Sequence, residues 1–148
     1  MTSQVDAFVA KYSPEIAAAI QACRKKLRKL VPRGYELIYD NYNALAIGYA
    51  PSEKASTVVI SIAAYPRWVT LFFLKGTTLL DPHGLLQGSG SRVRSIRLTS
   101  PADLDNQNIR SLMVQALAPQ AEAFDQAPKV KAMIKSVSAK QRPRRPAG

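Results

Sequence analysis

Four segments rich in β-branched and aromatic residues follow one another with only short links between them. They span residues 35–40, 45–49, 57–64 and 68–74. Parallel strands need crossover connections of about a dozen residues or more, whereas an antiparallel hairpin needs only a few. The four segments are therefore predicted to form an antiparallel meander, and residues 93–99 are predicted to add a fifth strand.

Helix-start signals flank this strand region on both sides. Residues 13–15 combine a serine cap, a first-turn proline and an acidic residue, and apolar residues then recur every three or four positions up to Val31. Residues 100–103 repeat the signal, and residues 130–137 have the spacing of a further short helix. We therefore predict an α+β fold, with N-terminal and C-terminal helices packed on one face of a five-stranded antiparallel sheet.

The net charge of +11 is concentrated at the two ends of the chain. Residues 35–127 carry seven basic and eight acidic side chains, so the surplus belongs to the segments on either side. Residues 1–127 are predicted to form a single domain, followed by a basic helical extension and a disordered tail over residues 128–148. Such a charge distribution attracts polyanions.

Composition excludes several classes of protein. One histidine and one cysteine are too few for a transition-metal site built from nitrogen and sulfur ligands. The sequence contains no phosphate-loop, dinucleotide-binding or nucleophile-elbow motif, so no catalytic residue, cofactor or metal is predicted. Pro66 and Arg67 interrupt the longest apolar window, and two strands explain it better than a membrane helix. With the lone Cys23 and no visible signal peptide, we expect a cytoplasmic protein without a membrane partner.

The loop before the fifth strand carries the clearest indication of a binding site. It holds the only histidine, and a glycine-rich turn followed by arginines comes after it. Such a turn exposes backbone N–H groups, and nearby guanidinium groups add the charge that an anion needs. We therefore predict a non-enzymatic domain that binds a small anionic or phosphorylated ligand here. The predicted ligand-binding residues are His83, Gly88, Ser89, Gly90, Ser91, Arg92 and Arg94.

Alternatives to this interpretation stay open. The loop arginines can instead pair with Asp81, Asp103 or Asp105, and a Ser89–His83–Asp81 arrangement would make an enzyme. The main functional alternative is nucleic-acid or polyanion binding through the basic first helix and the tail. Its predicted residues are Arg24, Lys25, Lys26, Arg28, Lys29, Arg142, Arg144 and Arg145. The tyrosines and the tryptophan of the strand region can stack bases, but we assign them to sheet packing.

Several stretches carry a family resemblance. They are Cys23-Arg24-Lys25, the tyrosine-rich first hairpin, VTLFF at 69–73, LLDPHGLLQGSG at 79–90, VRSIRL at 93–98, and the later Ile109 and Leu112. Over about three-quarters of the chain this pattern resembles the YdhG-like family, also called domain of unknown function 1801. The resemblance implies a small bacterial cytoplasmic domain similar in shape to frataxin, and most members of the family have no assigned activity.

One branch of that family is linked to iron delivery. In frataxin-like proteins this role depends on an acidic ridge along the first helix and the first strand edge. The first helix is basic here and offers only Asp6 and Glu15, with Glu36 and Asp40 beyond it. Because hard cations need clustered carboxylate oxygens, the iron role is not expected to carry over.

Overall fold

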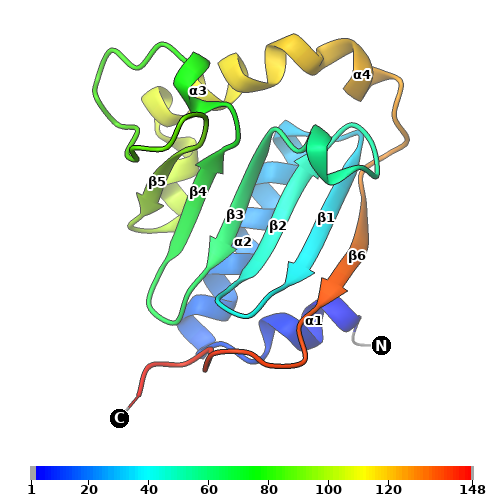
Figure 1. The fold of residues 1–148 in the computed structure, drawn as a ribbon, viewed down its shortest axis with the longest axis vertical. Coiled ribbons are helices and arrows are strands. Elements are labelled where there is room, and N and C mark those ends of the chain that lie inside the picture. Colours follow the sequence, from blue (N-terminus) through cyan, green and yellow to red (C-terminus); the bar gives the residue numbers. More distant parts are fainter. Residues whose placement is uncertain (1–2, 148) are drawn as a thin grey trace.

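A computed structural model describes residues 3–147 and contains a six-stranded mixed sheet (Figure 1). The predicted α+β class and the antiparallel meander are confirmed, whereas the five-stranded, wholly antiparallel sheet was wrong in detail. The strand order is β5-β4-β3-β2-β1-β6, and β6 pairs with β1 in parallel. The strands are β1 Tyr35–Asp40, β2 Leu45–Ala50, β3 Ile60–Ala64, β4 Val69–Phe73, β5 Arg94–Leu98 and β6 Lys131–Val137. Residues 1, 2 and 148, which the predicted domain and tail include, lie outside the described residues.

The helices lie mainly behind the sheet and at one end of it. In Figure 1, α2 crosses behind the sheet, and α3 and α4 lie toward its upper end. The helices are α1 Gln4–Val9, α2 Pro14–Leu30, α3 Gln107–Leu117 and α4 Ala121–Asp125, with 3-10 turns η1 Ala55–Thr57, η2 Gly76–Thr78, η3 Pro101–Asp105 and η4 Ala118–Gln120. The predicted start of α2 is confirmed, because the Ser13 hydroxyl accepts a hydrogen bond from the backbone N–H of Ile16. Across residues 3–147, none of the helices is both long enough and apolar enough to cross a bilayer.

The core lies between α2 and one face of the sheet. Ile38, Ile47, Ile62, Leu71 and Ile96 form a row across β1 to β5 and are all buried. The apolar stripe of α2 packs into the same core, together with buried side chains of α1, α3 and α4. The opposite face of the sheet turns toward the viewer in Figure 1, and among the described residues no α-helix crosses it.

Strand β6 occupies a segment that was predicted to be helical. Its pairing with β1 is regular up to Ile134 and resumes at Ser136, so Lys135 is the extra residue of a β-bulge. A bulge shifts the two-residue alternation of side chains by one position. The apolar residues on either side of it therefore fall at steps of three and four, which is the spacing of an amphipathic helix.

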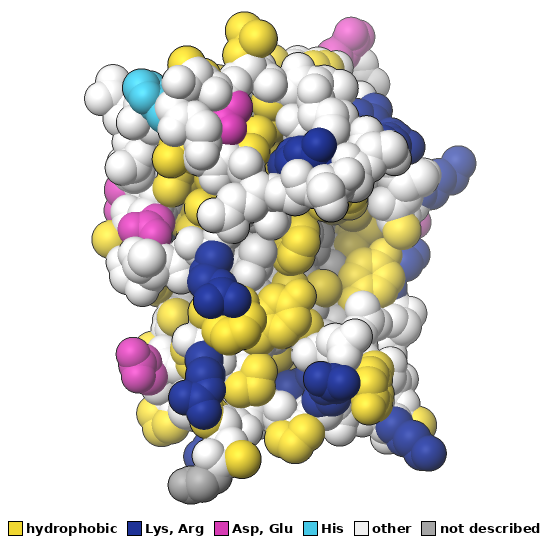
Figure 2. Space-filling model, turned by 60° about the vertical axis from the view of Figure 1, so that its left-hand side comes forward, with side chains coloured by type: hydrophobic (Ala, Val, Ile, Leu, Met, Phe, Trp, Pro, Cys, Tyr) yellow, Lys and Arg dark blue, Asp and Glu magenta, His cyan; other side chains and the backbone are white. Residues whose placement is uncertain are grey.

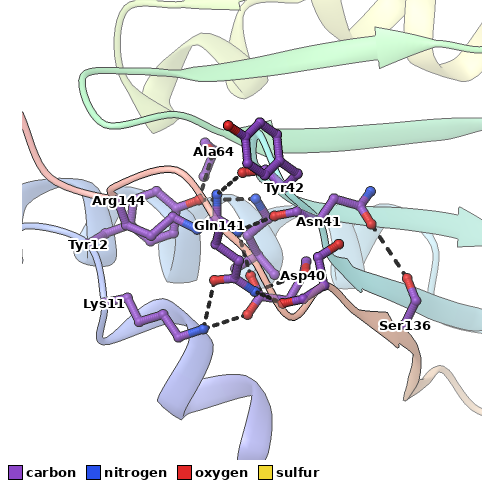
Figure 3. Close-up of polar contacts among 11 residues, drawn as sticks. Lys11, Tyr12, Asp40, Asn41, Tyr42, Ala64, Ser136, Gln141 and Arg144 are labelled. Carbon is purple, nitrogen blue, oxygen red and sulfur yellow. Dashed lines mark hydrogen bonds and ion pairs between the residues drawn. The ribbon is translucent and has the colours of Figure 1, made fainter.

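The tail is folded against β1, so the predicted disorder from residue 140 onward was wrong (Figure 3). Arg144 donates from Nη2 to Oδ1 of Asp40 at 2.9 Å, and Lys11 donates to the other carboxylate oxygen at 2.7 Å. Gln141 donates to the main-chain oxygen of Asp40 at 3.1 Å. Asp40 is 0% exposed and Arg144 is 5% exposed. A carboxylate buried in this way is stable only with such partners, which makes the tail part of the folded domain.

Replacing Arg144 by Gln is expected to lower the free energy of unfolding by about 3 kcal/mol, because buried Asp40 then keeps only its ion pair with Lys11. Arg145→Gln is the matched control, since this exposed side chain donates to the main-chain oxygen of Lys11. The control is expected to change the free energy by less than about 0.5 kcal/mol. Urea unfolding near neutral pH measures both variants, and equal losses would contradict the role given to the buried pair.

Candidate functional site

The glycine-rich loop between β4 and β5 uses one of its predicted ligand residues internally. Arg94 donates from Nη1 to the main-chain oxygens of Gly90 and Val93, at 2.6 and 2.8 Å. Arg92 and residues 88–91 are exposed. Arg94 therefore holds the loop together instead of standing free beside it, and its partners are carbonyl groups rather than the carboxylates that the sequence suggested.

His83 lies apart from these arginines. It lines a hollow of about 60 Å³ against α3, and residues 88–94 are not among the residues that line this hollow. The carboxylate of Asp81 accepts hydrogen bonds from the backbone N–H groups of Leu85 and Leu86, both at 2.9 Å. Asp81 thus caps the turn that follows it, and the hollow beside His83 does not include the other predicted anion-binding residues.

Two arginines of α2, the helix that was predicted as the basic first helix, bind the buried carboxylate of Glu36. Arg24 donates to its carboxylate from Nε and Nη2, at 3.2 and 2.9 Å, and Arg28 donates from Nε at 2.9 Å. The hydroxyl of Tyr49 donates to the same carboxylate at 2.6 Å. Burial opposes ionisation of Glu36, but these hydrogen bonds outweigh it and hold its pKa below the ordinary range. Arg24 and Arg28 therefore hold the helix to the sheet.

The other predicted nucleic-acid residues are scattered. Lys26 pairs with Asp105, and Arg144 is buried on Asp40. The last turns of α2 lie behind the upper half of the sheet, whereas the tail lies at its lower end (Figure 1). The exposed members of the set are Lys25, Lys29, Arg142 and Arg145. The structure thus does not join the first helix and the tail into one basic surface.

The sheet face opposite α2 has a different character. Its register places Tyr39, Ala46, Ala63, Thr70 and Arg97 in one row across β1 to β5. The two central strands contribute only methyl groups to this row, whereas the strands on either side contribute larger side chains. Ala46 and Ala63 line a shallow channel at the lower end of β2 and β3.

The neighbouring row continues this channel. Gly48 of β2 pairs with Ser61 of β3, next to Phe72 of β4. A side chain at Gly48 would collide with the methyl groups of Val58, so the segment that precedes β3 closes the channel at this end. We call the floor formed by Ala46 and Gly48 of β2 and by Ser61 and Ala63 of β3 the sheet trough.

Aromatic rings and guanidinium groups border the lower part of the trough. The guanidinium carbon of Arg97 lies 3.7 Å from the ring centroid of Trp68, and the rings of Trp68 and Tyr65 are 5.5 Å apart. On the other side, the guanidinium carbon of Arg142 lies 5.7 Å from the ring centroid of Tyr42. Figure 2 shows hydrophobic side chains gathered on this side of the molecule, with Lys and Arg side chains next to them.

Most of the positive charge has no ionic partner among residues 3–147. Over residues 3–147, ion pairs engage five of the 21 Lys and Arg side chains. Those five are Lys11, Arg24, Lys26, Arg28 and Arg144. Arg97 and Arg142 belong to the larger group, so the borders of the trough present cations that an external anion can neutralise.

Cys23 packs in the core. Its thiol is buried, and burial raises its pKa to about 11. The thiol is therefore protonated at neutral pH and is a poor nucleophile. In the part of the chain that the structure describes, no group of three His, Cys, Asp or Glu side chains is placed to hold a metal ion.

From the sequence we identified the aromatic residues but not the trough, because we assigned the aromatic side chains to packing within the sheet. The available signal was the pair of small residues at alternate positions in each central strand, Ala46 and Gly48 in one and Ser61 and Ala63 in the other. At Ala46 and Ala63 these small side chains leave a hollow above the strands, whereas Val58 covers Gly48.

Comparison of the chain with protein-family models, curated proteins and solved structures finds no match. The resemblance to the YdhG-like family therefore stays a prediction.

The free energy of unfolding is expected to fall as the pH is lowered from about 5 toward about 2. Burial opposes ionisation of Glu36 and Asp40, but their hydrogen bonds hold both pKa values below the ordinary range. In acid the unfolded chain binds protons that the folded chain does not, so acid favours unfolding. Glu36→Gln is expected to reduce this fall in the free energy of unfolding with decreasing pH, whatever its effect on that free energy at neutral pH. Glu122→Gln, at an exposed carboxylate, should keep the wild-type slope, and urea unfolding at a series of pH values compares the two.

Proposed function

We propose that this protein binds single-stranded nucleic acid across the open face of its sheet, along the sheet trough. The observation that carries the proposal is the placement of half-buried or exposed aromatic rings beside guanidinium groups that have no carboxylate partner within residues 3–147. Proteins that bind single strands combine the same two elements. Bases stack on the aromatic rings, and cations track the phosphates.

The aromatic borders favour a single strand over a duplex. Tyr42 is 49% exposed, and Trp68 and Tyr65 are half-buried at the surface of the sheet. Ring faces of this kind can stack only on bases whose own faces are free, and in a duplex those faces are already stacked on each other. The two borders lie on either side of the lower ends of β2 and β3 and line one hollow there, which leaves room for part of a strand to lie between them.

This proposal keeps the nucleic-acid alternative of the sequence analysis and moves its contact surface to the sheet. Arg142 is the one predicted residue that borders the trough in the described structure. Binding of a small anion at the glycine-rich loop stays a separate prediction, with exposed Arg92 as the cation for it.

Titration with a short oligothymidylate, about ten nucleotides long, is expected to quench the fluorescence of Trp68, the only tryptophan. Arg97→Gln is expected to weaken binding at low salt and to reduce the slope of log affinity against log salt by about 0.7, the value of one phosphate contact. Trp68→Leu is expected to weaken binding about tenfold without changing the slope of log affinity against log salt. The anisotropy of a labelled oligonucleotide measures binding by this variant.

Arg110→Gln is the matched control, because it removes the same charge from an exposed position on α3. Equal losses in Arg97→Gln and Arg110→Gln would show that attraction is general to the basic protein and would contradict the trough as the site. A larger loss in Arg92→Gln than in Arg97→Gln would move the site to the glycine-rich loop. Absence of any binding at low salt would reject the function.

A further inference from the structure

A hollow at the lower end of the sheet trough has the properties of a pocket for one base. From its shape and its polar groups we infer that it takes a single unpaired adenine, so that the open face prefers strands that contain adenine. This inference rests on the proposed function, because it specifies which base that same face selects.

The hollow is built to receive a flat ring. It has a volume of about 440 Å³, and Ala46 and Ala63 of the trough contribute methyl groups to its lining. Tyr42 and Tyr65 line it as well, from the β1–β2 turn and the β3–β4 turn. The ring of Tyr65 is supported by Trp68, at 5.5 Å between centroids. Small residues flanked by aromatic rings leave a slot in which a base can stack.

The polar side chains of the hollow include two amides and the hydroxyl of Ser138. Asn41 and Asn43 line it, and the hydroxyl of Ser136 donates to Oδ1 of Asn41 at 3.5 Å (Figure 3). This contact orients the amide and leaves its nitrogen free to donate to a ligand. Asn43 is exposed and adds a second amide at the same rim.

The absence of charge among the described lining residues decides between the bases. The O6 and N7 edge of guanine is matched best by Arg or Lys, and the amino group of cytosine by Asp or Glu. An asparagine amide instead pairs with N6 and N7 of adenine through two hydrogen bonds. Arg97 lies on Trp68, away from this hollow, and Arg142 lies against the ring of Tyr42 without being one of the lining residues. The base contacts inside the hollow therefore fall to its uncharged polar side chains.

The tail holds the hollow in shape. Arg144 donates to the main-chain oxygens of Asn41 and Tyr42, and the backbone N–H of Arg142 donates to the same oxygen of Tyr42 at 2.8 Å (Figure 3). The turn that carries both the amides and one ring is therefore fixed before a ligand arrives. A pocket formed in advance avoids the entropy cost of ordering that turn on binding.

The test compares oligodeoxyadenylate, oligothymidylate and oligodeoxycytidylate of equal length at one salt concentration, with binding followed by anisotropy. The intact protein is expected to bind the adenylate about tenfold more tightly than the cytidylate. In the double variant Asn41→Ala and Asn43→Ala, the affinity for the adenylate is expected to fall to the affinity for the other two strands. The slope against salt should not change, because no phosphate contact is lost.

Asn108→Ala, at an exposed position on α3, is the control and should keep the preference for adenine. Equal affinity for all three strands in the intact protein would overturn the inference while leaving the proposed function in place. If the double variant still prefers adenine, the preference comes from stacking on the rings, and the inference is likewise overturned. Failure of all three strands to bind would reject the proposed function itself.

Discussion

Glu36 and Asp40 lie on the face of β1 that points toward α2, and neither has exposed surface. Water cannot solvate these carboxylates, so their charges must be balanced by cations and hydrogen bonds from the protein. Glu36 is balanced by two arginines of α2, and Asp40 by Lys11 and Arg144 from the two ends of the chain. These pairs join the first helices, the sheet and the tail into one unit, and the position of every other element depends on that connection.

The same pairing explains how a stable domain leaves one sheet face open. Helix α2 and the cations that neutralise β1 lie on the core side, whereas Val58 lies over Gly48 on the opposite face. The two buried carboxylates take up four of the 21 basic side chains, so the remaining 17 basic and eight acidic residues still carry a net charge of +9. Arg97 is one of these, and it rests on the ring of Trp68 instead of on a carboxylate. Positive charge thus remains for the borders of the trough after the core carboxylates are balanced.

Local chemistry was enough to predict much of the fold. The Ser13 cap, the apolar stripe of α2 and the alternation in β1 to β5 act over a few residues and are legible along the chain. The bulge at Lys135 broke the alternation of an edge strand, so β6 resembled a helix. The tail looked disordered because its partner Asp40 lies 104 residues away from Arg144. The trough was missed because it depends on which residues of separate strands stand side by side.

The sequence by itself determined the α+β class, the meander, the first helix and the excess of positive charge, since capping, alternation and composition need no knowledge of distant contacts. Only the tertiary structure decided which arginines are buried partners and which face outward, and which aromatic rings border a free surface. The physical reason is that the cost of burying a charge depends on neighbours brought together by folding. Likewise, the open space above Ala46 and Ala63 exists only because the register sets these two small residues side by side.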